Sequence, residues 1–191
     1  MPLIPLPGWN ARGVLPPCDP ISQTSANRSP YAVSLIDLVT RFADTSQRQA
    51  ILQGLLDYRA ALHELGLVEG FQWLDGSFTE HVELIEQRAP NDVDVVTFVH
   101  RPQKPLPTRL PKILTDHDFV KHQYRVDSYF VELDELAPHA LVQQTAYWYS
   151  MWSHRRNEEW KGFLELNLDP LEDGEASQVL AQYVSERGAT S

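Results

Sequence analysis

The sequence predicts an α/β (α+β) fold in which a mixed β-sheet is flanked by helices. Four β-type runs are separated by segments whose apolar residues repeat at helical spacing. These runs lie near residues 71–75, 92–99, 124–133 and 160–168. The chain has 191 residues, of which 42% are hydrophobic and 22% charged, and it shows no internal repeat. This size and composition are typical of one globular domain with a full core.

An N-terminal arm is expected to precede this single domain. Residues 1–28 contain six of the 14 prolines and no sustained periodicity, which favours an extended arm lying on the domain. The domain is expected to span residues 29–191, with accessory helices in 29–66, a core in 67–168 and a C-terminal helix in 175–187.

Two helices are expected before residue 67. Ser29 and Pro30 have the form of an N-cap followed by proline at the first helical position. Behind them, apolar residues repeat at helical spacing at Leu35, Leu38, Val39 and Phe42. A capping box at Ser46 and Gln49 begins the second helix, whose apolar stripe stops at Gly66.

Strands and helices alternate after residue 70. The elements expected after the first run are a helix over 77–87, a strand over 92–99, a Pro-rich linker over 101–111, a helix over 112–122, a strand over 124–133, a helix over 139–153, a strand over 160–168 and a helix over 176–186. In the strand over 92–99, side chains alternate between two faces. One face is expected to carry Val93, Val95, Thr97 and Val99, and the other Asp92, Asp94, Val96 and Phe98.

The charge balance argues against broad, non-specific nucleic-acid binding. Lys and Arg number 16 and Asp and Glu 26, which gives a net charge of −10, whereas proteins that neutralise many phosphates are basic. Residues 101–125 are locally different, because six basic side chains there face only two acidic ones.

Cysteine usage and hydropathy predict a cytoplasmic protein without a membrane partner. Cys18 is the single cysteine, so an internal disulfide framework is excluded and a reducing compartment is favoured. No run of roughly 18 apolar residues occurs, and the first seven residues have no basic lead-in of the kind that signal peptides carry. The sequence also contains no His-x-x-x-His zinc pattern, no P-loop and no Gly-x-Gly-x-x-Gly motif.

Three pieces of sequence together indicate chemistry on phosphates. Gly76 and Ser77 stand at an expected strand-to-helix turn, where a backbone can approach a phosphate and a helix start offers free N–H groups. Asp92 and Asp94 point to the same face of their strand, so they can hold one cation or a pair of cations. Asp127 on a later strand would complete an all-oxygen site for Mg²⁺ or Mn²⁺.

This combination resembles the signature of the nucleotidyltransferase superfamily with the DNA polymerase beta-like fold, and in particular a small bacterial family of nucleotidyltransferase-like proteins. The residues that carry the resemblance are 13–17, 73–78, 90–96, 126–130 and 161–166. The resemblance implies a nucleotidyltransferase fold with residues 67–168 as its catalytic core. It implies that the catalytic Asp92, Asp94 and Asp127 bind the divalent metals and that Gly76 and Ser77 hold the triphosphate.

The implied reaction is the Mg²⁺-dependent transfer of a nucleoside monophosphate from a nucleoside triphosphate to a protein, RNA or small-molecule acceptor. Asp127 is expected to orient or deprotonate the attacking hydroxyl. Small members of the superfamily often serve in bacterial toxin–antitoxin or phage-defence modules, so a cognate partner protein is also implied. The alternatives are a non-catalytic nucleotide sensor or antitoxin-like partner that keeps the fold, and a related phosphotransferase such as a pyrophosphokinase.

Several assignments stay open at this level. Glu132 or Asp134, rather than Asp127, is an alternative third carboxylate, and Asp75 is expected to be a turn former rather than a ligand. Lys161 is expected either to contact the triphosphate or to be a plain surface lysine. An aromatic cluster is expected to be core, with a base-stacking platform as the alternative. Its members are Tyr147, Trp148, Tyr149, Trp152 and Trp160.

The segment between Ser77 and Asp92 is slightly longer than in the family. Fourteen residues separate the two positions, and residues 81–89 have the form of an added helical turn. This extension is expected to reshape the entrance for the substrate.

Overall fold

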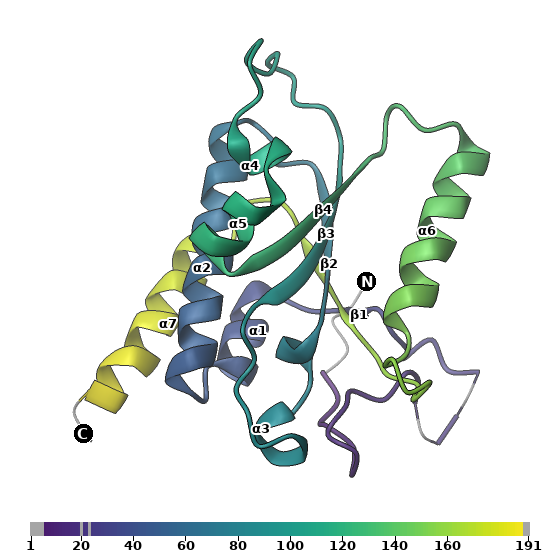
Figure 1. Cartoon of the computed structure of the whole chain (residues 1–191), viewed down its shortest axis with the longest axis vertical. Coiled ribbons are helices and arrows are strands. Elements are labelled where there is room, and N and C mark those ends of the chain that lie inside the picture. Colours follow the sequence, from purple (N-terminus) through teal and green to yellow (C-terminus); the bar gives the residue numbers. More distant parts are fainter. Residues whose placement is uncertain (1–5, 20, 23, 189–191) are drawn as a thin grey trace.

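A five-stranded mixed β-sheet lies between two unequal layers of helices (Figure 1). The computed structural model describes residues 6–19, 21, 22 and 24–188. The strand order is β1-β5-β2-β3-β4; β1 runs parallel to β5 and β3 parallel to β4, while β2 is antiparallel to both of its neighbours. The strands are β1 (Tyr31–Ala32), β2 (Gly70–Asp75), β3 (Val93–Val99), β4 (Val126–Glu132) and β5 (Leu164–Asn167). The expected mixed α/β architecture is therefore confirmed.

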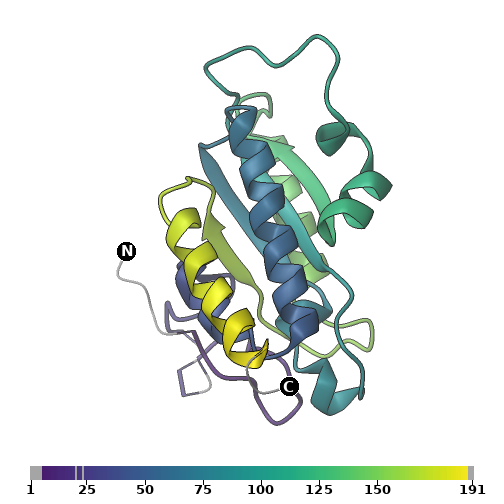
Figure 2. The same cartoon turned by 90° about the vertical axis from the view of Figure 1, so that its left-hand side faces the viewer.

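Most of the helices cover one face of the sheet. In Figure 2 the long helix α2 runs across this face beside α7. The helices of this layer are α1 (Leu35–Phe42), α2 (Ser46–Glu64), α4 (Lys112–Thr115), α5 (His117–Tyr124) and α7 (Asp173–Gly188). Their apolar side chains form the main core with the inner face of the sheet. The opposite face is covered only in part, by α6 (Pro138–Trp152), as Figure 1 shows.

The two faces of β3 carry the side chains that the alternation predicts. Val93 and Val95 are fully buried in the main core. Val96 and Phe98 are buried on the other face, in a second cluster with Trp148 of α6. The core interpretation is thus confirmed for Trp148 and for Trp152, which belong to the same cluster, whereas Tyr147 and Trp160 are exposed. The Asp94 side of the strand therefore faces the sparsely covered surface.

The expected helix start at Ser29 and Pro30 is wrong. The backbone after Pro30 instead forms strand β1, which pairs with β5. The Ser29 hydroxyl accepts a hydrogen bond from the Phe163 backbone N–H at 2.8 Å, so it serves the sheet edge rather than a helix. Helix α1 begins at Leu35, and its N-cap is Ser34.

The expected helix over residues 77–87 is also wrong, because the chain there is interrupted. A 3₁₀ turn at Ser77–Thr79 and the short helix α3 (Val82–Ile85) replace it. The buried Arg48 donates hydrogen bonds to the carbonyl oxygens of Phe78 and Glu80, and Glu80 is extended. A single 3₁₀ turn does not provide the helix dipole that the sequence interpretation placed behind Gly76.

The remaining elements agree with the prediction apart from their ends. The helix expected over 112–122 is divided at Asp116, which caps α5 by accepting a hydrogen bond from the Phe119 N–H. In the N-terminal arm, Val14 and Leu15 are fully buried, and the Leu15 carbonyl accepts a hydrogen bond from Gly162 N–H at 2.7 Å. No helix within the described part of the chain is long and apolar enough to cross a membrane.

Candidate functional site

Three carboxylates stand side by side at one end of the sheet. Asp75 at the end of β2 is the register partner of Asp94 on β3, and Asp94 is the register partner of Asp127 on β4. Register partners project to the same face of a sheet, which here is the sparsely covered face. Asp92 precedes Asp94 by two residues. The structure therefore brings together Asp92, Asp94 and Asp127, which the sequence predicts as one group.

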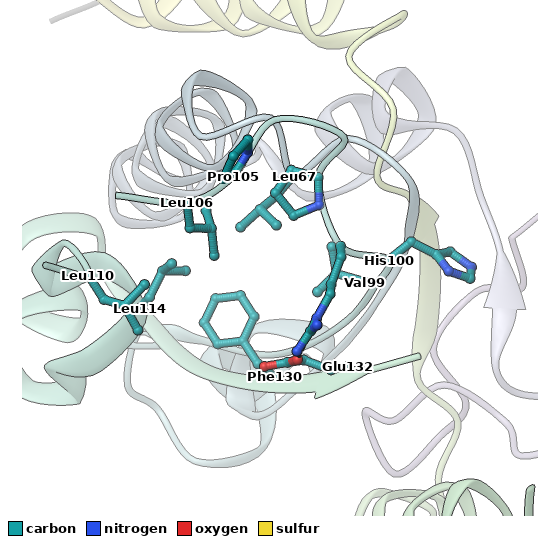
Figure 3. Close-up of a pocket in the computed structure, with 11 residues that line it drawn as sticks. Leu67, Val99, His100, Pro105, Leu106, Leu110, Leu114, Phe130 and Glu132 are labelled. Carbon is teal, nitrogen blue, oxygen red and sulfur yellow. Dashed lines mark ion pairs between the residues drawn. The ribbon is translucent and has the colours of Figure 1, made fainter. Parts of the chain in front are cut away.

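The other candidates for a third carboxylate lie elsewhere. Glu132 is paired in register with Val99, at the opposite end of β3. It contributes to an apolar pocket of about 390 Å³ beneath the Pro-rich segment 100–111, which Figure 3 shows. Asp134 accepts a hydrogen bond from the Arg101 backbone N–H and contacts His100. Neither carboxylate lies beside Asp94, so the geometry favours Asp127.

Asp75 is neutralised by a buried lysine. Lys161, 4% exposed, places its ammonium 2.8 Å from Asp75 Oδ1 and 2.9 Å from Glu80 Oε1. Burial alone would lower the pKa of Lys161, but the two carboxylates outweigh it and raise the pKa. The interpretation of Lys161 as a plain surface lysine is therefore wrong, and Asp75 is a buried ion-pair partner at the end of its strand.

A second lysine joins Asp92 and Asp127. The ammonium of Lys121, in the last turn of α5, lies 2.9 Å from Asp92 Oδ2 and 2.7 Å from Asp127 Oδ2. The hydrogen bond to Asp127 is the main reason why the pKa of Lys121 is raised. His117, at the start of α5, holds its Nε2 atom 2.7 Å from Asp127 Oδ1. Both oxygens of Asp127 therefore contact nitrogen atoms of one helix.

Asp94 is the acid of this group that forms no ion pair with any residue that the structure describes, although the charge of Lys161 acts on it. Burial, together with the charges of Asp75, Asp127 and Asp92, raises the pKa of Asp94 to about 7. Gly76 lies against this carboxylate with a φ of +83°, and a Cβ at this position would collide with Asp94 Oδ2. A glycine is therefore required where the turn passes Asp94.

Asp75 and Asp94 open onto a cleft of about 660 Å³, whereas Asp92 and Lys121 line a different pocket. Gly76, Ser77, Asp94 and Lys161 all line the cleft, although they are distant in sequence. The cleft also carries three arginines, namely Arg88, Arg155 and Arg156. Its volume lies within the range of small-molecule sites.

The arginines of the cleft differ in their partners. Arg155 pairs with Glu80 and Glu86, and Arg88 pairs with Glu86. Arg156 is exposed and forms no ion pair within the described ranges. Because arginine binds phosphate oxygens through its planar fork of donors, Arg156 is available for an anionic group in the cleft.

A comparison of sequences assigns the chain to a family. The sequence model of the "Family of unknown function (DUF6932)" matches residues 7–167. The chain belongs to this family. The match includes all five strands and every residue of the cleft. No curated protein and no solved structure matches the chain.

In this member of the DUF6932 family, the site offers a divalent cation one open carboxylate. Mg²⁺ and Mn²⁺ prefer carboxylate oxygens, and Asp94 supplies one that faces the cleft without a cationic partner. Within the described residues, no three His, Cys, Asp or Glu side chains are already arranged to hold an ion. Asp94 is therefore the carboxylate that is open to an ion, whereas the single ammonium of Lys121 already contacts both Asp92 and Asp127.

The basic partners of the acids were not predicted from the sequence. Lys121 and His117 are four residues apart, so one face of α5 presents both to Asp127, and this spacing was visible in the sequence. The role of Arg48 could not be predicted, because nothing in its helix indicates that its guanidinium reaches Glu83 of α3. Its role depends on a long-range contact.

Proposed function

We propose that this protein is a metal-dependent nucleotidyltransferase with a nucleotidyltransferase fold. It would transfer a nucleoside monophosphate from a bound nucleoside triphosphate to a hydroxyl of a protein, an RNA or a small molecule, with pyrophosphate as the leaving group. One observation carries the proposal: Gly76, Ser77 and Asp94 line a single cleft, and Asp127 is the register partner of Asp94. The resemblance seen in the sequence and the geometry of the site thus point to the same residues.

The triphosphate would lie along the basic wall of the cleft. Arg156 is free to pair with phosphate oxygens, and Arg155 reaches the same space with a side chain that is only 20% exposed. The turn at Gly76 lets a phosphate approach the backbone, and the Ser77 hydroxyl is available as a donor. Lys161 would contribute positive charge while it stays bound to Asp75 and Glu80.

The acids would supply the reactive end of the site. Asp94, joined by Asp92 and Asp127 once the Lys121 ammonium moves away from them, would hold Mg²⁺ or Mn²⁺, which when bound stabilises the charge that develops on the phosphate and the leaving oxygen. Asp127 lies beside Asp94 and is held by His117 and Lys121. In this position it would orient the acceptor hydroxyl and take up its proton.

A second candidate function is a nucleotide-binding sensor that keeps the fold without catalysis. The observation that favours it is the Lys121 ammonium, which already occupies the space between Asp92 and Asp127 as a shared ion-pair partner. The raised pKa of Asp94 favours the enzyme, because a group of interacting carboxylates is an electrostatic cost that a pure binding protein does not need.

A labelling experiment with purified protein distinguishes the candidates. The protein is incubated with Mg²⁺, with each of the four nucleoside triphosphates labelled at the α-phosphate, and with either cell lysate or total RNA. Label transferred to an acceptor by the wild type and by Asp57→Asn, a variant of an exposed acid on α2, but not by Asp94→Asn, supports the enzyme. Binding of a triphosphate without transfer supports the sensor, and the absence of both refutes the proposal.

A further inference from the structure

We propose that the exposed indole of Trp160 stacks on the base of the nucleotide whose phosphates are bound in the cleft. This inference rests on the proposed function. It assigns the base to a short hairpin, residues 154–160, which lies between α6 and β5. The arginines of the cleft provide partners for phosphates, whereas a planar base needs an aromatic or apolar surface.

The hairpin borders the cleft. His154 and Trp160 pair in an isolated antiparallel bridge, and the Arg155 backbone N–H donates a hydrogen bond to the Glu159 carbonyl at 2.8 Å. Four consecutive residues of the hairpin, 154–157, line the cleft. Residues that face each other across an antiparallel pair project to the same side. Trp160 therefore lies on the side of the hairpin to which His154 projects, at the border of the cleft.

The indole of Trp160 is exposed although the backbone around it is held in place. Trp160 is 63% exposed, and among the described residues its ring stacks on no other aromatic ring and on no cation. The next residue, Lys161, is buried, and its backbone N–H donates a hydrogen bond to the Ser153 carbonyl at 2.9 Å. A ring carried on a fixed backbone binds a planar ligand at a small cost in conformational entropy.

The other exposed aromatic side chains are already in contact with a ring. Tyr147, which is 56% exposed, lies 5.2 Å from the ring of Trp148, and Tyr129 lies 4.8 Å from the same ring. Of the aromatic side chains that the structure describes, Trp160 has the highest exposed fraction. It is therefore the aromatic ring that is most open to a ligand.

The hairpin offers both kinds of contact that a nucleotide needs. Arg156 lines the cleft and presents a planar fork of donors for phosphate oxygens. Trp160 presents an aromatic face, on which any of the four bases can stack. Met151, which is 41% exposed, adds an apolar side chain to the lining of the same cleft. The chemistry of this wall therefore matches a ligand with an anionic end and a planar end.

Two probes separate the base contact from the phosphate contact. The four nucleoside triphosphates and inorganic tripolyphosphate are titrated by calorimetry, each with Mg²⁺ and again with EDTA. The proteins are the wild type, Trp160→Ala, Trp160→Leu, Trp160→Phe and the control Tyr147→Ala, which removes an exposed aromatic ring from α6. Circular dichroism establishes that each variant is folded.

We expect Trp160→Ala and Trp160→Leu to weaken the binding of the nucleoside triphosphates about tenfold and to leave the affinity for tripolyphosphate unchanged. Trp160→Phe should retain most of the affinity because it keeps an aromatic face, and Tyr147→Ala should bind both probes as the wild type does. Unchanged nucleotide affinity in a folded variant without the ring, or an equal loss for both probes, would overturn the inference and leave the proposed function standing. If the wild type binds no nucleoside triphosphate, the proposed function fails, and the inference fails with it.

Discussion

Replacement of Asp94 by asparagine should stabilise the metal-free protein at alkaline pH. In the folded chain the pKa of Asp94 is raised from 3.8 to about 7 by burial and by the neighbouring carboxylates. Between these two values the folded state binds more protons than the unfolded state, so the free energy of unfolding falls as the pH rises. The stabilisation from the protonated form is complete below pH 4 and is lost through pH 7.

The pKa change corresponds to about 4 kcal/mol at most, of which about 2.5 kcal/mol develops between pH 5 and pH 8. Urea denaturation in the presence of EDTA, at pH 5 and at pH 8, measures this difference. For the wild type and for Asp57→Asn, the free energy of unfolding should fall over this interval by a common amount. For Asp94→Asn the fall should be smaller by up to about 2.5 kcal/mol. An equal fall in all three proteins would show that Asp94 is not held among uncompensated carboxylates.

Two further predictions concern the scaffold beneath the site. Gly54→Ala should lower the free energy of unfolding by about 2 kcal/mol or more, because the added methyl group would overlap the Tyr124 carbonyl and this clash outweighs the gain in helix propensity. Gly174→Ala, where a Cβ meets open space, is the matched control. Equal free energies of unfolding for the two variants in urea denaturation would contradict the close packing of α2 and α5. Arg48→Met should lower the free energy of unfolding by about 3–5 kcal/mol, because it leaves Glu83 and two carbonyl groups without the buried guanidinium that binds them. A thermal unfolding temperature of the variant equal to that of the wild type would refute a stabilising role of Arg48.

The sequence was sufficient to predict the strands β2 to β5 and the two faces of β3, because both depend on local alternation. In β3 the apolar residues at every second position face the large core, which leaves Asp94 on the other face. The breaks in the predicted helices could not be predicted in the same way. The helix expected after Gly76 is interrupted where Arg48, from a different helix, binds the carbonyls of Phe78 and Glu80. Such tertiary hydrogen bonds override local helix propensity.

The pairing of β1 with β5 explains why the helix start predicted at Ser29 and Pro30 is wrong. The motif there has the form of a helix start, but the two-residue strand β1 lies against β5, more than 130 residues later in the chain. A strand of two residues has no alternation that a pattern can detect. Its position is determined by its partner, through hydrogen bonds such as that from Tyr31 N–H to the Phe163 carbonyl.

The availability of each acid for a ligand is determined by its basic partner, and the spacing of the acids alone does not encode it. Asp75 and Asp94 are register neighbours, yet Lys161 neutralises the first and leaves the second open. Asp92 and Asp94 are two residues apart on one face, yet only Asp92 meets Lys121. A carboxylate that already contacts an internal ammonium has less to gain from an external cation. Asp94 is therefore the acid at which a ligand cation would relieve most electrostatic repulsion.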